Sequence, residues 1–107
     1  MKSSKKTIVI SYIFPLTNKK AGIYPNPFQN NVNISFVSEQ GKEIAVQIYD
    51  LSGTLIKCIQ AGNLQSGENT IVWDTRNKNG IFVKPDTYIC RIFLNNKVIT
   101  EKMIKVP

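Results

Sequence analysis

Short runs in which apolar and polar side chains alternate recur along this chain from residue 21 onward. Val32, Ile34 and Phe36 alternate with polar residues, and the same period of two returns at 44–49 and 88–94. Successive side chains of a β-strand point to opposite faces, so this period predicts strands that bury one face. Apolar residues at helical spacing form no run of useful length. We therefore expect an all-β chain.

Residues that favour turns separate these runs. Asp50-Leu-Ser-Gly53 places Asp first and Gly last, which predicts a tight turn. Asn95-Asn96 is typical of a two-residue type I′ hairpin, because Asn tolerates the positive φ that this turn requires. A polar loop is expected at Gly62 to Gly67. The predicted strands cover residues 32–36, 44–49, 54–60, 69–73, 88–94 and 97–106.

The number and spacing of these strands indicate how they pack. A single sheet would leave its apolar face in water, so a second layer is required. With 107 residues, of which 42% are hydrophobic, the chain is long enough to close one core but not two. We predict one immunoglobulin-like antiparallel β-sandwich of about seven strands over residues 21–107, preceded by a tail at 1–20.

The last predicted strand differs from the others because both of its faces carry apolar residues. Val98, Ile104 and Val106 lie in one phase, and Ile99 and Met103 lie in the other. Such a strand is either bulged near Glu101 or covered on its outer side. A partner protein could bind this edge by strand addition or by docking on the side face.

The first twenty residues have a different character. Lysines precede an apolar run at 7–16, a pattern that resembles a signal peptide and is too short to span a bilayer. No small-x-small cleavage site follows, so the alternative is a strand or tail left from an upstream region. Five lysines here carry most of the net charge of +7, whereas the rest of the chain holds nine basic and seven acidic residues. The basic excess therefore does not indicate a nucleic-acid-binding surface.

Residues that usually carry catalysis or bind metals are scarce. The chain has no histidine, which removes the commonest general base and the commonest neutral metal ligand. Cys58 and Cys90 are 32 residues apart without a CxxC pattern, which leaves a disulfide or two buried small apolar residues as the alternatives. Asp50, Asp74 and Asp86 could in principle pair for hydrolysis, but a domain of this size offers no obvious cleft. We expect no enzyme activity, no cofactor, no metal and no small-molecule substrate.

One group of residues partly fits the frame of a calcium-binding loop. Asn77, Asn79, Gly80 and Asp86 occupy positions 3, 5, 6 and 12 of a calcium-loop frame that starts at Thr75. Only one carboxylate would face the ion, and no helices flank the loop. The ligand count favours an Asn- and Gly-rich turn instead.

Four motifs follow one another in an order that resembles a known family. They are YPNPF at 24–28, IYDLSG at 48–53, VWD at 72–74 with Asn79-Gly80, and a strand-opening Tyr88 with KMIKV at 102–106. The set resembles the type A C-terminal sorting domain of the type IX (Por) secretion system over about residues 22–107. It is also similar to the immunoglobulin-like domain of the flagellar hook-capping protein.

The resemblance implies a non-catalytic targeting module at the end of an exported cargo. Such a module is recognised by the outer-membrane type IX machinery, and a sortase-like peptidase commonly removes it. The implied route leads through the periplasm to the outer membrane and cell surface, where the cargo is anchored or released. The alternative is a structural assembly module of the hook-capping type. The candidate recognition and structural residues are Pro25, Asn26, Pro27, Gly53, Trp73, Gly80, Tyr88, Lys102 and Lys105.

These candidates also have structural interpretations. Trp73 and Tyr88 are expected to fill the core between the sheets, and the two glycines to form turns. Pro25 and Pro27 are expected to stiffen the approach to the first alternating strand and to prevent outside strands from pairing there. The sequence departs from the family pattern where Thr75 and Thr87 replace glycines, and Asp86 is expected to supply the turn conformation instead.

Overall fold

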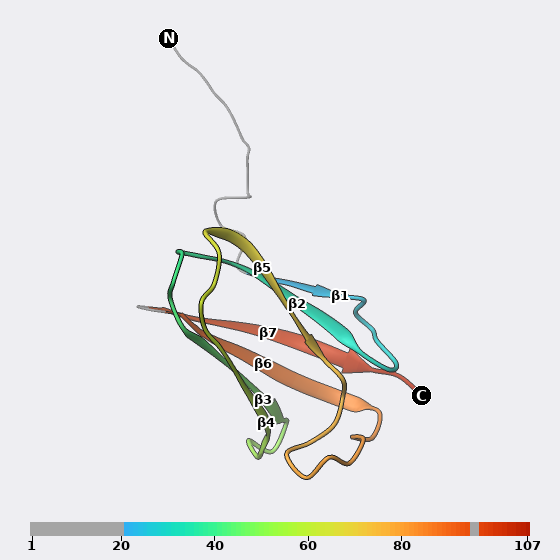
Figure 1. The fold of residues 1–107 in the computed structure, drawn as a ribbon. Helices are drawn as coiled ribbons and strands as arrows, with labels where there is room; N and C mark the ends of the chain where they lie inside the picture. The colour runs from blue at the N-terminus through green and yellow to red at the C-terminus, as the bar shows by residue number, and fades with distance from the viewer. Residues whose placement is uncertain (1–20, 95–96) are drawn as a thin grey trace.

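The computed structural model describes residues 21–94 and 97–107, which form seven antiparallel strands in two stacked sheets (Figure 1). A three-stranded sheet has the order β1-β2-β5 and a four-stranded sheet the order β4-β3-β6-β7. The predicted all-β sandwich is confirmed. Within these ranges no helix is long and apolar enough to cross a membrane. The strands are β1 (Ala21–Tyr24), β2 (Val32–Ser38), β3 (Ile44–Asp50), β4 (Leu55–Ala61), β5 (Gly67–Trp73), β6 (Asp86–Leu94) and β7 (Lys97–Lys105).

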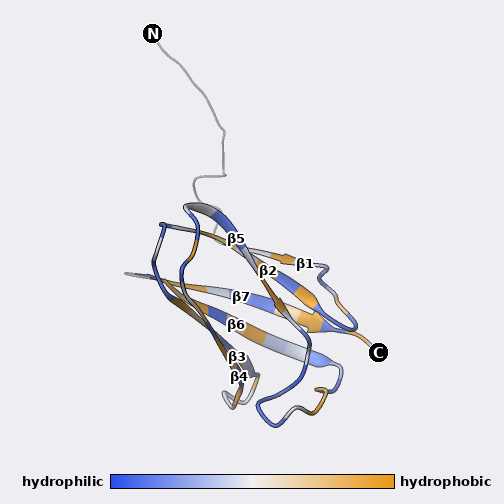
Figure 2. Ribbon diagram, viewed as in Figure 1, coloured by the Kyte–Doolittle hydropathy of each residue, from blue (hydrophilic) through white to orange (hydrophobic). Residues whose placement is uncertain are grey.

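The alternating residues form the core between the sheets. In Figure 2 apolar and polar segments alternate along the strands. On β2 the apolar side chains of Val32, Ile34 and Phe36 are buried, and on β3 every second residue from Ile44 to Ile48 is buried as well. Burial of one apolar face on each sheet is therefore the main favourable contribution to folding.

Six of the predicted strands are confirmed with ends shifted by one or two residues, and one strand was missed. The missed strand, β1, has four residues and pairs with β2 from Ala21↔Phe36 to Tyr24↔Asn33. It is too short to display an alternating pattern. The signal-like segment at 1–20 and the turn predicted at Asn95–Asn96 lie outside the described residues.

The predicted turn after β3 is confirmed. The backbone N–H of Gly53 donates to the carbonyl of Asp50 at 3.1 Å, and Gly53 has a φ of +91°, which explains the choice of glycine. One carboxylate oxygen of Asp50 accepts hydrogen bonds from the hydroxyl and backbone N–H of Ser52 and from the backbone N–H of Thr54. The Ser52 hydroxyl contributes most, and together these bonds hold the Asp50 pKa below its usual value.

One expectation about backbone conformation is wrong, and one of the two alternatives for the last strand is excluded. Asp86 does not supply a turn conformation, because it begins β6 and pairs with Lys105. Thr75 itself adopts the left-handed region with φ of +67° and is 1% exposed, which is unusual for a β-branched residue. The strand β7 is not bulged at Glu101, because its pairing with β6 continues without a register shift.

The two cysteines are free and differ in their surroundings. Cys90 is buried in β6 and Cys58 is exposed on β4, so the disulfide is excluded and only one of the two is a buried apolar residue. Their separation follows from the register, in which Gln47 of β3 lies opposite Cys58 on one side while Cys90 pairs with the neighbouring Ile48. Burial, and to a lesser degree Glu101, raises the pKa of the Cys90 thiol to about 12.

Candidate functional site

The YPNPF motif lies beside the C-terminal half of β7. The Asn26 side-chain Nδ2 donates to the carbonyl oxygen of Lys102 at 3.0 Å, and its Oδ1 accepts from the backbone N–H of Ile104 at 2.9 Å. A side-chain amide carries one donor and one acceptor in the geometry of a peptide group. Asn26 therefore takes the place of a neighbouring strand for two residues of β7.

Phe28 extends this pairing along the same edge. Its backbone N–H donates to the carbonyl of Ile104 at 2.9 Å, and its carbonyl accepts from the N–H of Val106 at 2.8 Å. The Gln29 side chain adds a hydrogen bond from Nε2 to the backbone carbonyl of Pro107 at 2.8 Å. We call residues 25–29 the clamp, because they hold the last residues of the chain along one edge.

The core anchors the clamp. The Phe28 side chain is 1% exposed, and its ring meets that of Trp73 edge-on with centroids 6.1 Å apart. Pro25 and Pro27 have no backbone N–H, so they cannot donate to a further strand. The clamp thus covers the outer edge of β7 from Lys102 onward and offers no complete strand edge of its own.

The structure brings some of the predicted residues together and separates others. Gly53 and Gly80 lie in two loops, where Gly80 has a φ of +79° and closes a turn with a hydrogen bond from its N–H to the carbonyl of Asn77. Trp73 and Tyr88 lie in the core. The residues that meet at the clamp and β7 are Pro25, Asn26, Pro27, Lys102 and Lys105.

Phe28, Gln29, Ile104 and Val106 also belong to this site and were not predicted as site residues. Phe28 could have been found as the apolar residue that follows the two prolines. The backbone groups of Ile104 and Val106 carry no sequence signal, because any residue provides them.

The polar atoms of the two buried aromatic residues are satisfied locally. The Trp73 Nε1–H donates to the carbonyl of Arg76 at 2.9 Å, and the Tyr88 hydroxyl donates to the carbonyl of Lys84 at 2.6 Å. Burial raises the Tyr88 pKa, with smaller contributions from the negative charges of Asp86 and Asp50. The hydrogen bonds of Trp73 and Tyr88 fix the loop between β5 and β6, and both side chains therefore have a structural role.

The three aspartates considered for hydrolysis serve as local caps. Asp74 accepts from the backbone N–H of Arg76 at 3.1 Å, and Asp86 accepts from that of Thr87 at 2.8 Å. Asp50 holds the turn after β3 in the same way. This is the common behaviour of aspartate at turns.

The loop that partly fits a calcium-binding frame is held by hydrogen bonds between the Asn77 side chain and the loop's own backbone. The Asn77 Oδ1 accepts from the N–H groups of Asn79 and Ile81 at 2.9 and 3.0 Å. Over residues 21–94 and 97–107, no three His, Cys, Asp or Glu side chains come together as a metal site. The loop is an Asn-based turn.

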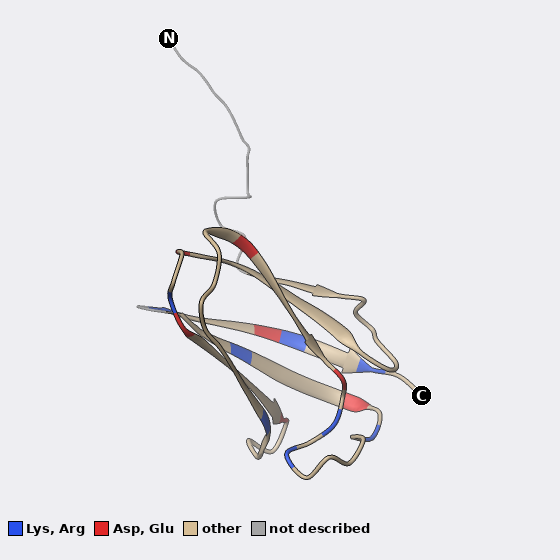
Figure 3. Cartoon of the chain, in the orientation of Figure 1, with Lys and Arg blue, Asp and Glu red and all other residues tan. Residues whose placement is uncertain are grey.

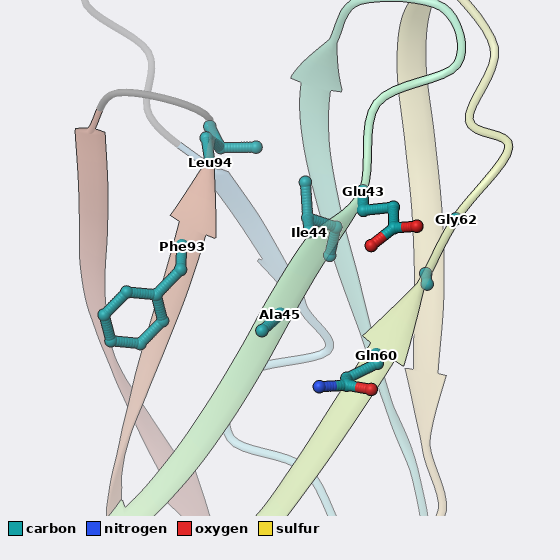
Figure 4. A pocket seen from close by; sticks show the side chains of 8 residues that line it. Glu43, Ile44, Ala45, Gln60, Gly62, Phe93 and Leu94 are labelled. Carbon is teal, nitrogen blue, oxygen red and sulfur yellow. The ribbon is translucent and has the colours of Figure 1, made fainter.

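A shallow hollow lies on the outer face of the four-stranded sheet (Figure 4). It arises because the small Ala45 sits between Gln60 on one neighbouring strand and Phe93 on the other. Glu43 is the single charged residue that lines it. The hollow has no nucleophile beside a base, so its chemistry gives no support to a catalytic interpretation.

Comparison with known proteins relates the chain to one family. The sequence profile of the secretion system C-terminal sorting domain matches residues 22–106, which is nearly all of the described part. No curated protein sequence matches the chain.

Solved structures share the fold. Dimeric latent PorU from Porphyromonas gingivalis has a TM-score of 0.65 at 21% identity over 80% of this chain and 9% of PorU. PorZ, described as an essential surface component of the type IX secretion system of the same organism, has a TM-score of 0.57 at 21% identity over 81% of this chain and 11% of PorZ. FlgD from Xanthomonas campestris, a hook-capping protein, has a TM-score of 0.57 at 15% identity, covering 80% of this chain and 62% of FlgD.

Proposed function

This chain belongs to the family of secretion system C-terminal sorting domains, and we propose that the outer-membrane type IX machinery recognises the clamp and β7 as one surface. The domain is a targeting module of the type IX system. Its presence implies a cargo that is secreted or held at the cell surface. The fold shared with FlgD at 15% identity concerns architecture, whereas the family match favours targeting over hook assembly.

The bond between Asn26 and β7 is the observation that carries this proposal. The residues that form the surface lie 76 positions apart and meet only in the folded domain. Asn26 and Phe28 bind backbone groups of β7, so the Lys102 side chain remains exposed for a partner. The machinery therefore reads a folded surface rather than a linear peptide, and the domain needs no catalytic group of its own.

We propose two further steps, which the family match supports. The cargo passes through the periplasm before this recognition. A sortase-like peptidase then removes the domain while the cargo becomes attached to the surface or is released. Residues 1–20, which precede β1 in the sequence, are the natural place for such a cut, because a cut there leaves the sandwich whole.

The test is an export assay in a host with a working type IX system. The full 107-residue chain is fused behind a signal peptide and a fluorescent reporter, and the reporter is located by surface labelling and fractionation. We expect surface reporter for the native chain and periplasmic reporter for Lys102→Glu combined with Lys105→Glu, which changes side chains and leaves the backbone bonds of the clamp in place.

Asn30→Ala, which alters an exposed residue next to the clamp, is the matched control and should be exported normally. Circular dichroism of the double variant establishes that it is folded. Periplasmic retention of the native fusion would contradict the targeting role. Normal export of the folded double variant would contradict recognition of the clamp and β7 as one surface.

A further inference from the structure

The loop between β5 and β6 contains the one asparagine–glycine pair of the sequence, Asn79-Gly80. Both residues are exposed, and within the described residues no hydrogen bond involves the Asn79 side chain. An asparagine in this setting is chemically labile, because the backbone nitrogen of the next residue can attack its side-chain amide carbon. Glycine makes this attack easiest, since no Cβ shields its nitrogen.

The reaction at this pair needs no group from outside except water. The Gly80 nitrogen loses its proton and forms a bond to Cγ of Asn79, and the side-chain nitrogen leaves as ammonia. The resulting five-membered imide then takes up one water. Hydrolysis at one carbonyl gives aspartate at position 79. Hydrolysis at the other gives isoaspartate, in which the main chain runs through the side-chain carbons.

The folded loop opposes this reaction through Asn77. The backbone carbonyl of Asn77 accepts the N–H of Gly80 at 2.9 Å, and this N–H carries the proton that the reaction must remove. The Asn77 Oδ1 accepts from the N–H groups of Asn79 and Ile81 at 2.9 and 3.0 Å. The Asn77 N–H donates to the carbonyl of Ile81 at 2.8 Å. Asn77 therefore fixes the backbone on both sides of the labile pair.

A bond to the neighbouring strand holds the same loop. The Lys78 N–H donates to the carbonyl of Ile56 in β4 at 3.0 Å. Five successive backbone N–H groups, from residue 77 to residue 81, thus have a hydrogen-bond acceptor. Gly80 has a φ of +79°, which glycine adopts without strain. The attacking nitrogen is therefore held in a turn, and the loop must open before this nitrogen reacts.

The charge around the pair favours the reaction once the loop opens. Figure 3 shows basic residues on the loop between β5 and β6, and Lys78 directly precedes the pair. The attacking nitrogen carries negative charge after it loses its proton, and a nearby cation stabilises that charge. The rate of reaction in the open loop should therefore rise with pH.

We propose that Asn79-Gly80 is a self-modification site that Asn77 keeps closed in the folded domain and that reacts when the loop opens. This inference does not depend on the sorting function. Aspartate at position 79 leaves the turn intact, because no hydrogen bond of the described loop uses the Asn79 side chain. Isoaspartate lengthens the main chain between Asn77 and Ile81, so their bonds do not re-form in the same register. A chain that stays unfolded for long thus acquires a permanent defect in this loop.

The test compares the full chain in its folded state and in guanidinium chloride at pH 8. Samples taken over time are digested with trypsin, and mass spectrometry follows the peptide 79–91, in which Asn79 is the one asparagine. We expect conversion of Asn79 to be at least about tenfold faster in the denaturant than in the folded chain. Asn77→Ala, without denaturant, should accelerate conversion about tenfold, because it removes the two bonds that Oδ1 accepts.

Two variants separate this role of Asn77 from general stability. Asn77→Asp keeps an Oδ1 acceptor, so conversion of Asn79 should stay close to the native rate. Asn69→Ala removes comparable side-chain bonds from the loop before β5, where the Asn69 amide binds Gln65 and Gly67. This control should leave conversion of Asn79 unchanged. Circular dichroism establishes that each variant is folded.

Equal rates in the folded native chain and in the denaturant would overturn the proposal, because the fold would then give no protection. Conversion in Asn77→Ala at the native rate would overturn the role of Asn77. Equal acceleration by Asn77→Ala and Asn69→Ala would overturn that role as well, since global unfolding would then control the reaction.

Discussion

The ring of Trp73 stands edge-on to the ring of Tyr88, with centroids 6.0 Å apart and planes at 75°. Trp73 ends β5 in one sheet and Tyr88 lies in β6 of the other, so this contact joins the two layers. The ring of Phe28, which belongs to the clamp, also meets the Trp73 ring edge-on. Three aromatic rings, each from a different sequence motif, thus form one cluster that spans the core.

Replacing Trp73 should therefore loosen both sheets. We expect Trp73→Phe to lower the free energy of unfolding by about 2–3 kcal/mol, since it removes buried volume and the hydrogen bond to Arg76. Urea denaturation measures the change. Val72→Ala, at the exposed neighbouring position, should alter stability by less than about 0.5 kcal/mol. Equal effects of the two substitutions would refute the central role of Trp73.

Asn26 provides a test of the clamp. Asn26→Ala removes one donor and one acceptor from the edge of β7, and we expect a loss of about 1–2 kcal/mol in unfolding free energy. Asn26→Asp should also destabilise, because it sets a carboxylate oxygen against the Lys102 carbonyl. Hydrogen exchange of the Ile104 amide should accelerate in Asn26→Ala and stay unchanged in Asn30→Ala. Unaltered exchange in Asn26→Ala would show that the amide bond is not formed in solution.

Thr75 should reverse the usual ranking of alanine and glycine. At its φ of +67° a Cβ is unfavourable, so Thr75→Gly should be more stable than Thr75→Ala by about 1 kcal/mol. At Thr70 in β5, which is extended, glycine should instead be the less stable of the two. Thermal or urea unfolding of the four variants measures both differences. The same ranking at both positions would contradict the left-handed conformation of Thr75.

The two thiols should react very differently. Cys58 is exposed, whereas Cys90 is buried with a pKa raised to about 12, so little thiolate forms there at pH 8. Alkylation of the folded chain at pH 8, followed by mass spectrometry, should show one modification on Cys58. In denaturant both thiols should react. Rapid labelling of Cys90 in the folded chain would indicate that β6 is exposed.

Asp50 should make stability depend on pH in the acidic range. Its pKa is lower in the folded state than in the unfolded chain, chiefly through the Ser52 hydroxyl. The stabilisation is therefore complete above the unfolded pKa, near 4, and is lost as the pH falls through the folded pKa. The difference in unfolding free energy between the native chain and Asp50→Asn should shrink between about pH 5 and pH 2. A pH-independent difference would contradict this role.

Alternation along β2, β3 and β6 was enough to predict two layers, because burial of one face has a strict period of two. The turn at Asp50 was also predictable from local sequence, because Asp at the first position and Gly at the last position favour a tight turn. β1 was missed because its four residues are too few to show the alternation of apolar and polar side chains. The site could be predicted only in part, since Asn26 and Lys102 were recognised as motif residues while their contact depends on how distant segments meet.

The backbone of Thr75 shows a second limit of the sequence. Asp86 has a known tendency toward the left-handed region, and this local propensity suggested that it would adopt the turn conformation there. The structure places the left-handed residue at Thr75, where the hydroxyl reaches the carbonyl of Asn30 at 3.3 Å and the side chain is enclosed. Tertiary packing thus overrides the preference of a single residue.

The clamp gives the order of the strands a meaning for biosynthesis. Among the seven described strands β7 is translated last, and its Met103 fills the core while its edge completes the bonds of Asn26. A product cut short by premature termination ahead of Lys102 lacks this closure and would display an unfinished domain. Because Asn26 and Lys102 are 76 positions apart, their contact forms only after nearly the whole sandwich has been translated, and a truncated product lacks the proposed recognition surface.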